Sequence, residues 1–454
     1  MPAPLAGVRV IEMGQLIAVP WATKMLADMG AQVIRLESCA RLESYRTDAL
    51  FENEVEGEFW NRGGNFYEHN RNKLGITLDL GQPEGLSILR ELISIADVFV
   101  ENFTPRVIKN FGLEYEDLQK IKPDIIMVSS TGYGFTGPWA NFGATGPATE
   151  GASGLAFMTG YRDGPPVMSE IPYTDYVSSE HTVFAIMAAL MHQLGTGQGQ
   201  FVDISQTQAS SATVPEALMD YSANGRIAPR AGNEDSAMSP HGCYPCTGHD
   251  HWVVIAVATD AQWKSLCQVL GTEDWLEDER FADGLARWRH RLDLDELLPA
   301  VTRAWDSKDL MNRLQSAGVA AGAVMDSSDL LFDPHLLDRK FYEVVSHDPS
   351  TGMPPLPYAS RPWKLAGTPA VPGEAAPTMG EHNKLILGDL LGRTDEEMAN
   401  LEDKGIIGYG PTNPRPVSRP SPEEQVRLGR MQRYDEDYRE RLNRAYGTEP
   451  NPHT

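Results

Sequence analysis

The stretch LAGVRVIEMGQLIAVPWATKMLADMGAQVIRLE, residues 5–37, decides the fold class. Val8–Ile11 is a short run rich in β-branched residues, which is typical of a buried strand. Trp21–Met29 carries apolar residues at helical spacing, and Gly30 follows as a residue that commonly ends a helix. A second strand is predicted at Gln32–Leu36. The order strand, helix, strand predicts a β-α-β unit with two parallel strands.

The same alternation continues over roughly the first 200 residues, with a helix predicted at Pro83–Ile95. Repeated β-α units predict an α/β protein whose parallel sheet is covered by helices. The longest predicted helix, Val177–Leu194, is a largely apolar cylinder, so we expect it to be buried on most faces, including Phe184, Ala188 and Met191. The remaining predicted strands are Ile76–Leu78, Asp97–Val100, Asp124–Val128 and Phe201–Ile204.

The composition changes along the chain and predicts its division into domains. We expect a large α/β domain over 1–222 and a smaller domain over 223–345, which opens with a loop rich in Asn, Gly, Ser and Pro. Residues 346–410 are expected to return to the large domain, and the Pro-rich, then charged, residues 411–454 form a C-terminal extension. Three further helices are expected at Ser205–Tyr221, Ala261–Leu270 and Leu294–Ala317.

The charge balance argues against two classes of partner. The 454 residues include 39 Lys and Arg against 63 Asp and Glu, a net charge of −24. Non-specific nucleic-acid binding and anchoring to an anionic membrane both need a basic surface, so neither partner is expected. Four cysteines do not make a disulfide scaffold in a chain of this length, and MPAPLAGVRVIEMG lacks the pattern of a signal peptide. We therefore expect a cytoplasmic protein.

Two motifs suggest other chemistry, and neither is favoured. Gly132, Gly134 and Gly137 form G-x-G-x-x-G after a predicted strand, but neither the helix nor the acid of a dinucleotide site follows. We interpret them as a turn that needs glycine. The run HGCYPCTGHDH, residues 241–251, has zinc-like spacing but no second ligand pair nearby, so we predict no metal site.

Asp175 precedes the long apolar helix in the run IPYTDYVSS. An acid in this position is favoured by the helix dipole and by capping, and this structural interpretation is the one that the local sequence favours. Carboxylates also act as covalent nucleophiles, but nothing in the local sequence indicates that role.

Several segments together resemble a known family. They are the opening β-α-β unit, NRNKLGITLDL (70–80), VENFTP (100–105), GYGFTGP (132–138), GQGQFVD (197–203) and AGVAAGAV (317–324). In order and spacing, residues 4–408 resemble the family III CoA-transferases (CaiB/BaiF family), which include formyl-CoA:oxalate transferase and the α-methylacyl-CoA racemases. The resemblance implies a Rossmann-like doubly wound large domain, a smaller α+β domain and an interlocked homodimer. Some relatives pair two different subunits, so a hetero-oligomer stays open.

The resemblance implies an acyl-CoA:carboxylate CoA-transferase with Asp175 as its catalytic nucleophile. In that mechanism an acyl-aspartyl anhydride becomes an aspartyl-CoA thioester, and an acceptor carboxylate then takes the CoA. Coenzyme A and acyl-CoA are substrates, and no tightly bound cofactor is implied. The family's CoA contacts, together with nearby basic candidates, fall here on Ile17, Ala18, Ser38, Arg41, Lys73, Leu78, Asp79, Leu80, Gly81, Asn102, Phe103, Thr104 and Arg106.

Two other functions stay open at this point. The related racemases carry a histidine where this sequence has Thr145, and a threonine hydroxyl does not exchange protons readily near neutral pH. The third hypothesis is a non-catalytic CoA-binding subunit, and the presence of Asp175 argues against it. Residues 42–67 depart from the family pattern, and the aromatic residues Trp60, Phe66 and Tyr67 either line the acyl pocket or pack in the core.

Overall fold

The computed structural model describes residues 2–368, 373–415 and 420–448. The chain divides into two compact units. The sequence-based range of the small domain, 223–345, overlaps the second unit without sharing its bounds. The first unit comprises Met1–Gly154, Ser169–Pro215 and His335–Thr454, and the second comprises Leu155–Met168 and Glu216–Pro334.

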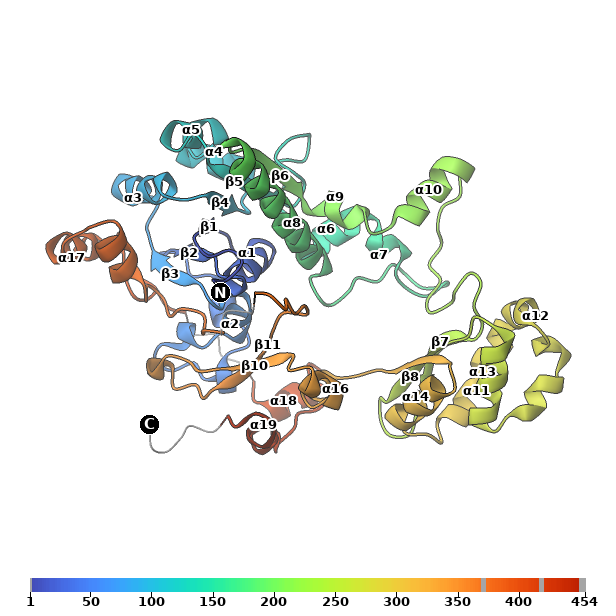
Figure 1. Ribbon diagram of the computed structural model, residues 1–454. Helices are drawn as coiled ribbons and strands as arrows, with labels where there is room; N and C mark the ends of the chain where they lie inside the picture. The colour runs from blue at the N-terminus through green and yellow to red at the C-terminus, as the bar shows by residue number, and fades with distance from the viewer. Residues whose placement is uncertain (1, 369–372, 416–419, 449–454) are drawn as a thin grey trace. The chain divides into compact units, whose positions relative to one another are not determined.

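A six-stranded sheet with the strand order β3-β2-β1-β4-β5-β6 forms the centre of the first unit (Figure 1). The strands are β1 (Arg9–Met13), β2 (Gln32–Glu37), β3 (Leu74–Thr77), β4 (Val98–Glu101), β5 (Ile126–Thr131) and β6 (Phe201–Ser205). All five pairings are parallel, which confirms the predicted α/β class. This order is that of a Rossmann-like sheet, in which the winding reverses between β1 and β4.

Helices cover both faces of this sheet: α1 (Ala18–Asp28), α3 (Pro83–Ser94), α4 (Pro105–Phe111), α5 (Tyr115–Ile121) and α8 (Tyr173–Thr196). Neighbouring residues of β1 point to opposite faces. Val10 packs in an apolar cluster with residues of α1 and α8, and Ile11 packs in another with residues of α3, α4 and α5. Strand β1 is therefore buried on both sides, which explains its largely apolar sequence.

The chain returns to the first unit after residue 334. The π-helix η7 (Lys384–Leu390) and α17 (Asp395–Asp403) pack in the same apolar cluster as Ile11. The Asn383 side chain accepts a hydrogen bond from the backbone N–H of Thr77 at 2.9 Å, which fixes this return to β3. Other elements of the first unit are η1 (Ser44–Thr47), η2 (Phe51–Asn53), η3 (Phe59–Asn61), α2 (Gly64–Asn70), α6 (Gly146–Ser153), α9 (Gln206–Ser211), β10 (Tyr342–Val345), η6 (Pro349–Thr351) and β11 (Leu356–Ala359).

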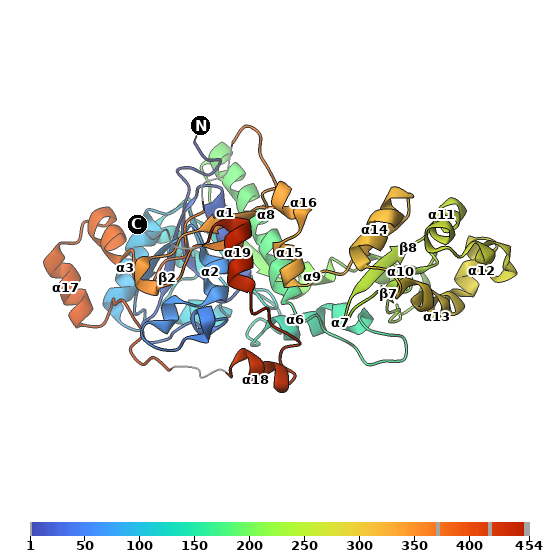
Figure 2. The same cartoon turned by 90° about the horizontal axis from the view of Figure 1, so that it is seen from below.

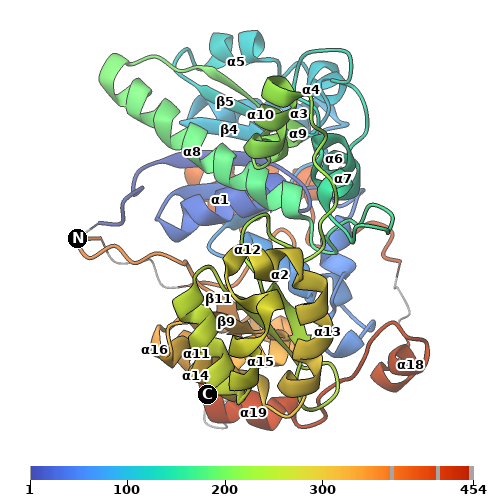
Figure 3. The same ribbon diagram turned by 90° about the vertical axis from the view of Figure 1, so that its right-hand side faces the viewer.

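The second unit contains an antiparallel sheet in the order β7-β8-β9, of which Figure 1 labels β7 and β8. Figure 3 labels β9 and the helices α11, α12, α13 and α14 of this unit. Its apolar cluster joins Val253 and Ile255 to helix residues such as Trp263, Leu298 and Leu314. The unit comprises α7 (Leu155–Met158), α10 (Pro215–Asn224), β7 (His241–Pro245), β8 (Trp252–Ala256), α11 (Asp260–Leu270), η4 (Glu273–Glu277), η5 (Glu279–Phe281), α12 (Gly284–Arg289), α13 (Arg291–Thr302), α14 (Ser307–Ser316), β9 (Ala320–Ala323) and α15 (Ser327–Leu331), and α16 (Pro334–Asp338) leads back to the first unit.

Three predicted helices differ from the structure. The segment expected over Ser205–Tyr221 forms two helices, α9 and α10, and Leu294–Ala317 falls on two helices, α13 and α14, because Asp306 caps a new helix there. The burial expected of the long helix is wrong on one side. On α8, Phe184 and Met191 are 78% and 73% exposed, and Ala188 is exposed too.

The described C-terminal extension forms two short helices, α18 (Pro422–Arg427) and α19 (Tyr438–Tyr446) (Figure 2). Ser421 caps the first, since its hydroxyl accepts a hydrogen bond from the backbone of Glu424. Among the described residues, no helix is both long and apolar enough to cross a bilayer.

Candidate functional site

A cavity of about 460 Å³ opens at the carboxyl ends of β1, β4 and β5. The reversal of winding between β1 and β4 leaves this crevice, which is the usual ligand site of such sheets. The lining residues all belong to the first unit. They are Gln15, Leu16, Ile17, Tyr45, Asn102, Phe103, Thr104, Val107, Thr131, Gly132, Ala140, Phe142, Gly143, Ala144, Thr145, Gly146, Pro147, Pro172, Asp175 and Gln206.

Asp175 enters this cavity from the first turn of α8. Its Oδ2 lies so close to Gly146 that a Cβ at that position would approach it to 2.7 Å. A side chain at residue 146 would therefore displace the carboxyl group. The Gln206 side chain, from the start of α9, hydrogen-bonds the Asp175 carboxyl from another side.

The surroundings of Asp175 make it a weakly solvated acid. Burial raises its pKa from 3.8 to about 6, although hydrogen bonds from its own backbone and from Gln206 act in the opposite direction. Asp175 is also the one charged residue among the described residues that line the cavity. A carboxylate that is ionised at neutral pH but poorly hydrated is suited to nucleophilic attack.

An aromatic wall stands beside Asp175. His69 contacts the rings of Trp21 and Tyr45 at 5.4 Å each, and its Nε2 lies 3.1 Å from the hydroxyl of Tyr176. The other ring nitrogen donates to the carbonyl of Asn65 at 2.7 Å, so the Tyr176 hydroxyl donates to Nε2. Burial lowers the pKa of His69 to about 4, and the wall is therefore neutral at physiological pH.

Hydrogen bonds fix the turn after β1, which lines the cavity. The Asn102 side chain accepts from the backbone N–H of Gln15 at 2.9 Å and donates to its carbonyl at 2.8 Å. Leu16 has a positive φ of 62°, which is unusual for a branched residue, and its N–H donates to Glu43 at 2.8 Å. The ends of β1 and β4 are thus joined where the crevice opens.

A cluster of buried charges lies behind this turn. Arg35 pairs with both Glu12 and Glu43, and Lys73 pairs with Glu12 at 2.9 Å. Lys73 also donates to the carbonyl of Pro20 and to the side chain of Asn70, each at 2.8 Å. The Lys73 side chain is 0% exposed, and its ammonium group already has three partners, so the structure does not place it where it could meet a CoA phosphate.

The other sequence-predicted CoA contacts fall into separate groups. Ile17, Asn102, Phe103 and Thr104 line the cavity, and buried Ala18 begins α1 directly after Ile17. The β3–α3 turn does not line the cavity. The backbone N–H of Asp79 in this turn donates to the carbonyl of Ile406. Outside the cavity lining stand Ser38, Arg41, Leu78, Asp79, Leu80, Gly81 and Arg106, of which Arg41 and Arg106 are exposed and Leu78 is part of the core.

Sequence reasoning missed Tyr45, Gly146 and Gln206. No local pattern marks them, because each reaches Asp175 only through the fold. The aromatic segment 42–67 was a partial signal, but Phe66 and Tyr67 lie in an apolar cluster, which supports the core interpretation for these two.

The glycine motif forms a turn, and the first five residues of the Cys/His run form strand β7. Gly134 and Gly137 have φ values of 93° and 90°, so they form the turn that needs glycine. His241 contacts the carbonyl of Asn233 at 2.6 Å, and Cys246 is buried. Over residues 2–368, 373–415 and 420–448, no three His, Cys, Asp or Glu side chains gather as a metal site.

A family model described as CoA-transferase family III matches residues 5–383. The chain belongs to this family. The succinate–glutarate CoA-transferase of Agrobacterium fabrum is 33% identical to this CoA-transferase over 389 residues, 85% of this chain and 96% of the relative. The succinyl-CoA–D-citramalate CoA-transferase of Chloroflexus aurantiacus is 32% identical over 406 residues, covering 89% of this chain and 98% of the relative.

Solved structures agree with this membership. The crystal structure of a CaiB/BaiF family protein from Brucella suis matches this CoA-transferase with a TM-score of 0.78 and 30% identity, over 86% of this chain and 100% of that chain. The family resemblance recognised from the sequence is therefore confirmed.

Proposed function

We propose that this enzyme is an acyl-CoA:carboxylate CoA-transferase that works through an aspartyl-CoA thioester on Asp175. One observation carries the proposal: the crevice of the sheet presents a poorly solvated carboxylate among uncharged neighbours. A carboxyl group can become an anhydride and then a thioester, which a serine or threonine hydroxyl cannot.

The reaction would begin when an Asp175 carboxylate oxygen attacks the carbonyl carbon of the donor thioester. The C–S bond breaks, CoA leaves as a thiolate, and a mixed anhydride remains. The thiolate then attacks Cγ of Asp175, and the donor acid leaves as a carboxylate. An acceptor carboxylate runs the two steps in reverse, which yields the new acyl-CoA and free Asp175. Protons balance without a general base.

Neutral groups around the carboxylate would assist these steps. The Gln206 amide would hold Asp175 in place, and the Tyr45 phenol stays protonated because burial raises its pKa. We further propose that the turn at Ile17 and the residues Asn102–Thr104 bind the CoA arm, since these line the same cavity. The exposed Arg106 lies two residues beyond Thr104 and is suited to a phosphate group.

The relatives suggest which acids to test first. Their names specify succinate, glutarate and D-citramalate, so dicarboxylates are the first candidates for donor and acceptor here. Racemisation is the weaker alternative, because it needs a second acid–base group. Apart from Asp175, the described cavity lining offers hydroxyls, those of Tyr45, Thr104, Thr131 and Thr145, which do not titrate near neutral pH.

The decisive experiment traps the intermediate. The enzyme is incubated with succinyl-CoA, treated with hydroxylamine or borohydride, and digested for mass spectrometry. Modification of Asp175 and a loss of exchange by at least about 10³-fold in Asp175→Ala are expected. Full CoA-transfer activity in a folded Asp175→Ala enzyme would contradict the proposal. Deuterium uptake at the α-carbon from D₂O without an acceptor would support racemisation instead.

We also propose that two copies associate. The exposed apolar side chains of α8 are the support, because contiguous apolar surface commonly marks an interface. A homodimer is the simpler assembly, although relatives named as alpha and beta subunits of a succinyl-CoA–L-malate CoA-transferase show that two different chains occur in the family.

A further inference from the structure

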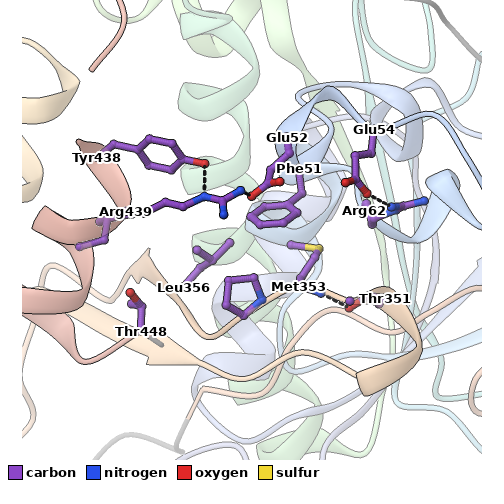
Figure 4. A pocket seen from close by; sticks show the side chains of 13 residues that line it. Phe51, Glu52, Glu54, Arg62, Thr351, Met353, Leu356, Tyr438, Arg439 and Thr448 are labelled. Atoms are coloured by element: carbon purple, nitrogen blue, oxygen red, sulfur yellow. Dashed lines mark hydrogen bonds and ion pairs between the residues drawn. The ribbon is translucent and has the colours of Figure 1, made fainter. Parts of the chain in front are cut away.

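The C-terminal arm, residues 420–448, lies beyond residue 383, where the family match ends. It contacts residues 44–63, hereafter the 44–63 segment, which carries Tyr45 into the Asp175 cavity. Figure 4 shows α19 presenting Arg439 toward Glu52, with Phe51 and Tyr438 on either side. The arm therefore lies outside the family match and touches the segment that supplies Tyr45 to the candidate active site.

The 44–63 segment has a costly backbone. Ala49, Glu52 and Asn53 have φ values of 48°, 54° and 57°, in the left-handed region that residues other than glycine rarely adopt. Such conformations persist only where the surroundings hold them. One end is held from within the fold, because Arg46 donates twice to Glu37, each time at 2.6 Å.

The end at residue 63 is held by backbone pairing with residues 49–51, and the arm contacts the middle of the 44–63 segment. Arg439 forms an ion pair with Glu52, and α19 and η2 together line a cavity of about 590 Å³. The arm is anchored beyond this point as well, since Tyr446 meets the ring of Tyr342 edge-on at 6.1 Å. Thr448, at its end, is only 6% exposed.

Charge favours this contact. Residues 52–58, ENEVEGE, contain four glutamates, whose mutual repulsion would spread the segment. Helix α19, YRERLNRAY, carries three arginines and one glutamate. The arm thus brings positive charge to the most acidic part of the 44–63 segment.

Tyr45 and Phe51 share one support. Both pack against the apolar cluster of Phe66, Tyr67 and Val345. A shift of Phe51 therefore disturbs the packing that also orients Tyr45. We propose that Arg439 is a positioning residue: through Glu52 it holds the 44–63 segment, and so keeps Tyr45 at the Asp175 cavity. The proposal deepens the CoA-transferase function and rests on it.

The test compares Arg439→Glu, Glu52→Arg and the double swap in the full-length enzyme. Each single change is expected to lower kcat/KM by about fivefold, and the double swap to restore most of it. In a Tyr45→Phe background, Arg439→Glu should have no further effect. Arg427→Glu is the matched control, because Arg427 pairs with Glu424 inside the arm and should leave kcat/KM unchanged.

A second readout does not depend on activity. Amide hydrogen exchange at residues 49–58, without substrate, should be faster in Arg439→Glu and normal in the swap. Unchanged amide exchange in Arg439→Glu would contradict the proposal that Arg439 holds the 44–63 segment. If Arg439→Glu lowers kcat/KM equally in the Tyr45→Phe background, the proposed link to Tyr45 is wrong. If no donor and acceptor pair supports transfer, the proposed function fails, and CoA affinity then replaces kcat/KM in the same comparison.

Discussion

Asp175 combines a catalytic requirement with a cost. The nucleophile must be ionised, yet burial raises its pKa to about 6. We expect kcat/KM to fall about tenfold per pH unit below pH 6, because only the carboxylate attacks the thioester. A pH–rate profile of kcat/KM from pH 5 to 8 measures this. A profile that stays flat down to pH 5 would contradict the assignment.

The same raised pKa predicts an effect on stability. An acid whose folded pKa exceeds its unfolded pKa binds more protons when folded, so stability falls as pH rises from about 4 to 6. At pH 7 the charge costs at most about 3 kcal/mol. Asp175→Asn should therefore raise Tm at pH 7 but not at pH 3.5. Thermal unfolding at both pH values checks this, and an unchanged Tm at pH 7 would contradict it.

What the sequence reveals about single residues depends on distance along the chain. Asp175 is locally indistinguishable from a helix-capping acid, and only the resemblance to a family marks it as a nucleophile. Tyr45 and Gln206 reach it from segments about 130 and 30 residues away, which no local pattern encodes. Lys73 looks like a phosphate ligand in sequence because the short motif Asn70–Lys73 is basic, whereas its burial is a property of the fold.

The elements behind the site depend on the buried charge cluster. Lys73, on the approach to β3, neutralises Glu12 of β1, which also holds Arg35 of β2. Removing one partner leaves an uncompensated buried charge. Lys73→Met should therefore lower the free energy of unfolding by roughly 3–5 kcal/mol while changing KM for the acyl-CoA donor less than twofold in the folded fraction. Urea unfolding and steady-state kinetics measure the two effects.

Arg106→Met is the contrasting variant for that experiment. Arg106 is exposed at the start of α4, so its loss should leave unfolding unchanged and raise KM for the acyl-CoA donor. If Lys73→Met instead raises KM for the acyl-CoA donor without loss of stability, Lys73 is a CoA ligand after all.

The positions of strands and helices were predictable where neighbouring parts of the same chain bury them. The strands of the sheet follow from apolar runs, since both faces are covered by nearby helices. Helix α8 was predictable in position but not in burial. Its apolar residues pack on the sheet through Ile186 and Leu190, whereas Phe184 and Met191 face outward. A sequence shows that a helix is apolar all round, but the second surface that it covers need not belong to the same chain.

At the scale of the whole molecule, the outward face of α8 therefore predicts association. Phe184 and Met191 are seven residues apart, two turns along one side of the helix, and Leu194 extends the patch with an exposure of 87%. Phe184→Glu with Met191→Glu would place two charges in a desolvated interface. We expect the variant to be monomeric by light scattering at concentrations where the parent is a dimer.

The reason for choosing these two positions is that they contribute nothing to the folded monomer. Neither belongs to the apolar cluster that packs α8 against the sheet, so a charge there should leave Tm of the isolated chain unchanged. Lys120→Glu, on the exposed side of α5, controls for the added negative charge. A parent enzyme that is monomeric at every concentration would contradict the proposed dimer. A double variant that remains dimeric would place the interface elsewhere, because two buried, unpaired glutamates cannot be accommodated in an apolar contact.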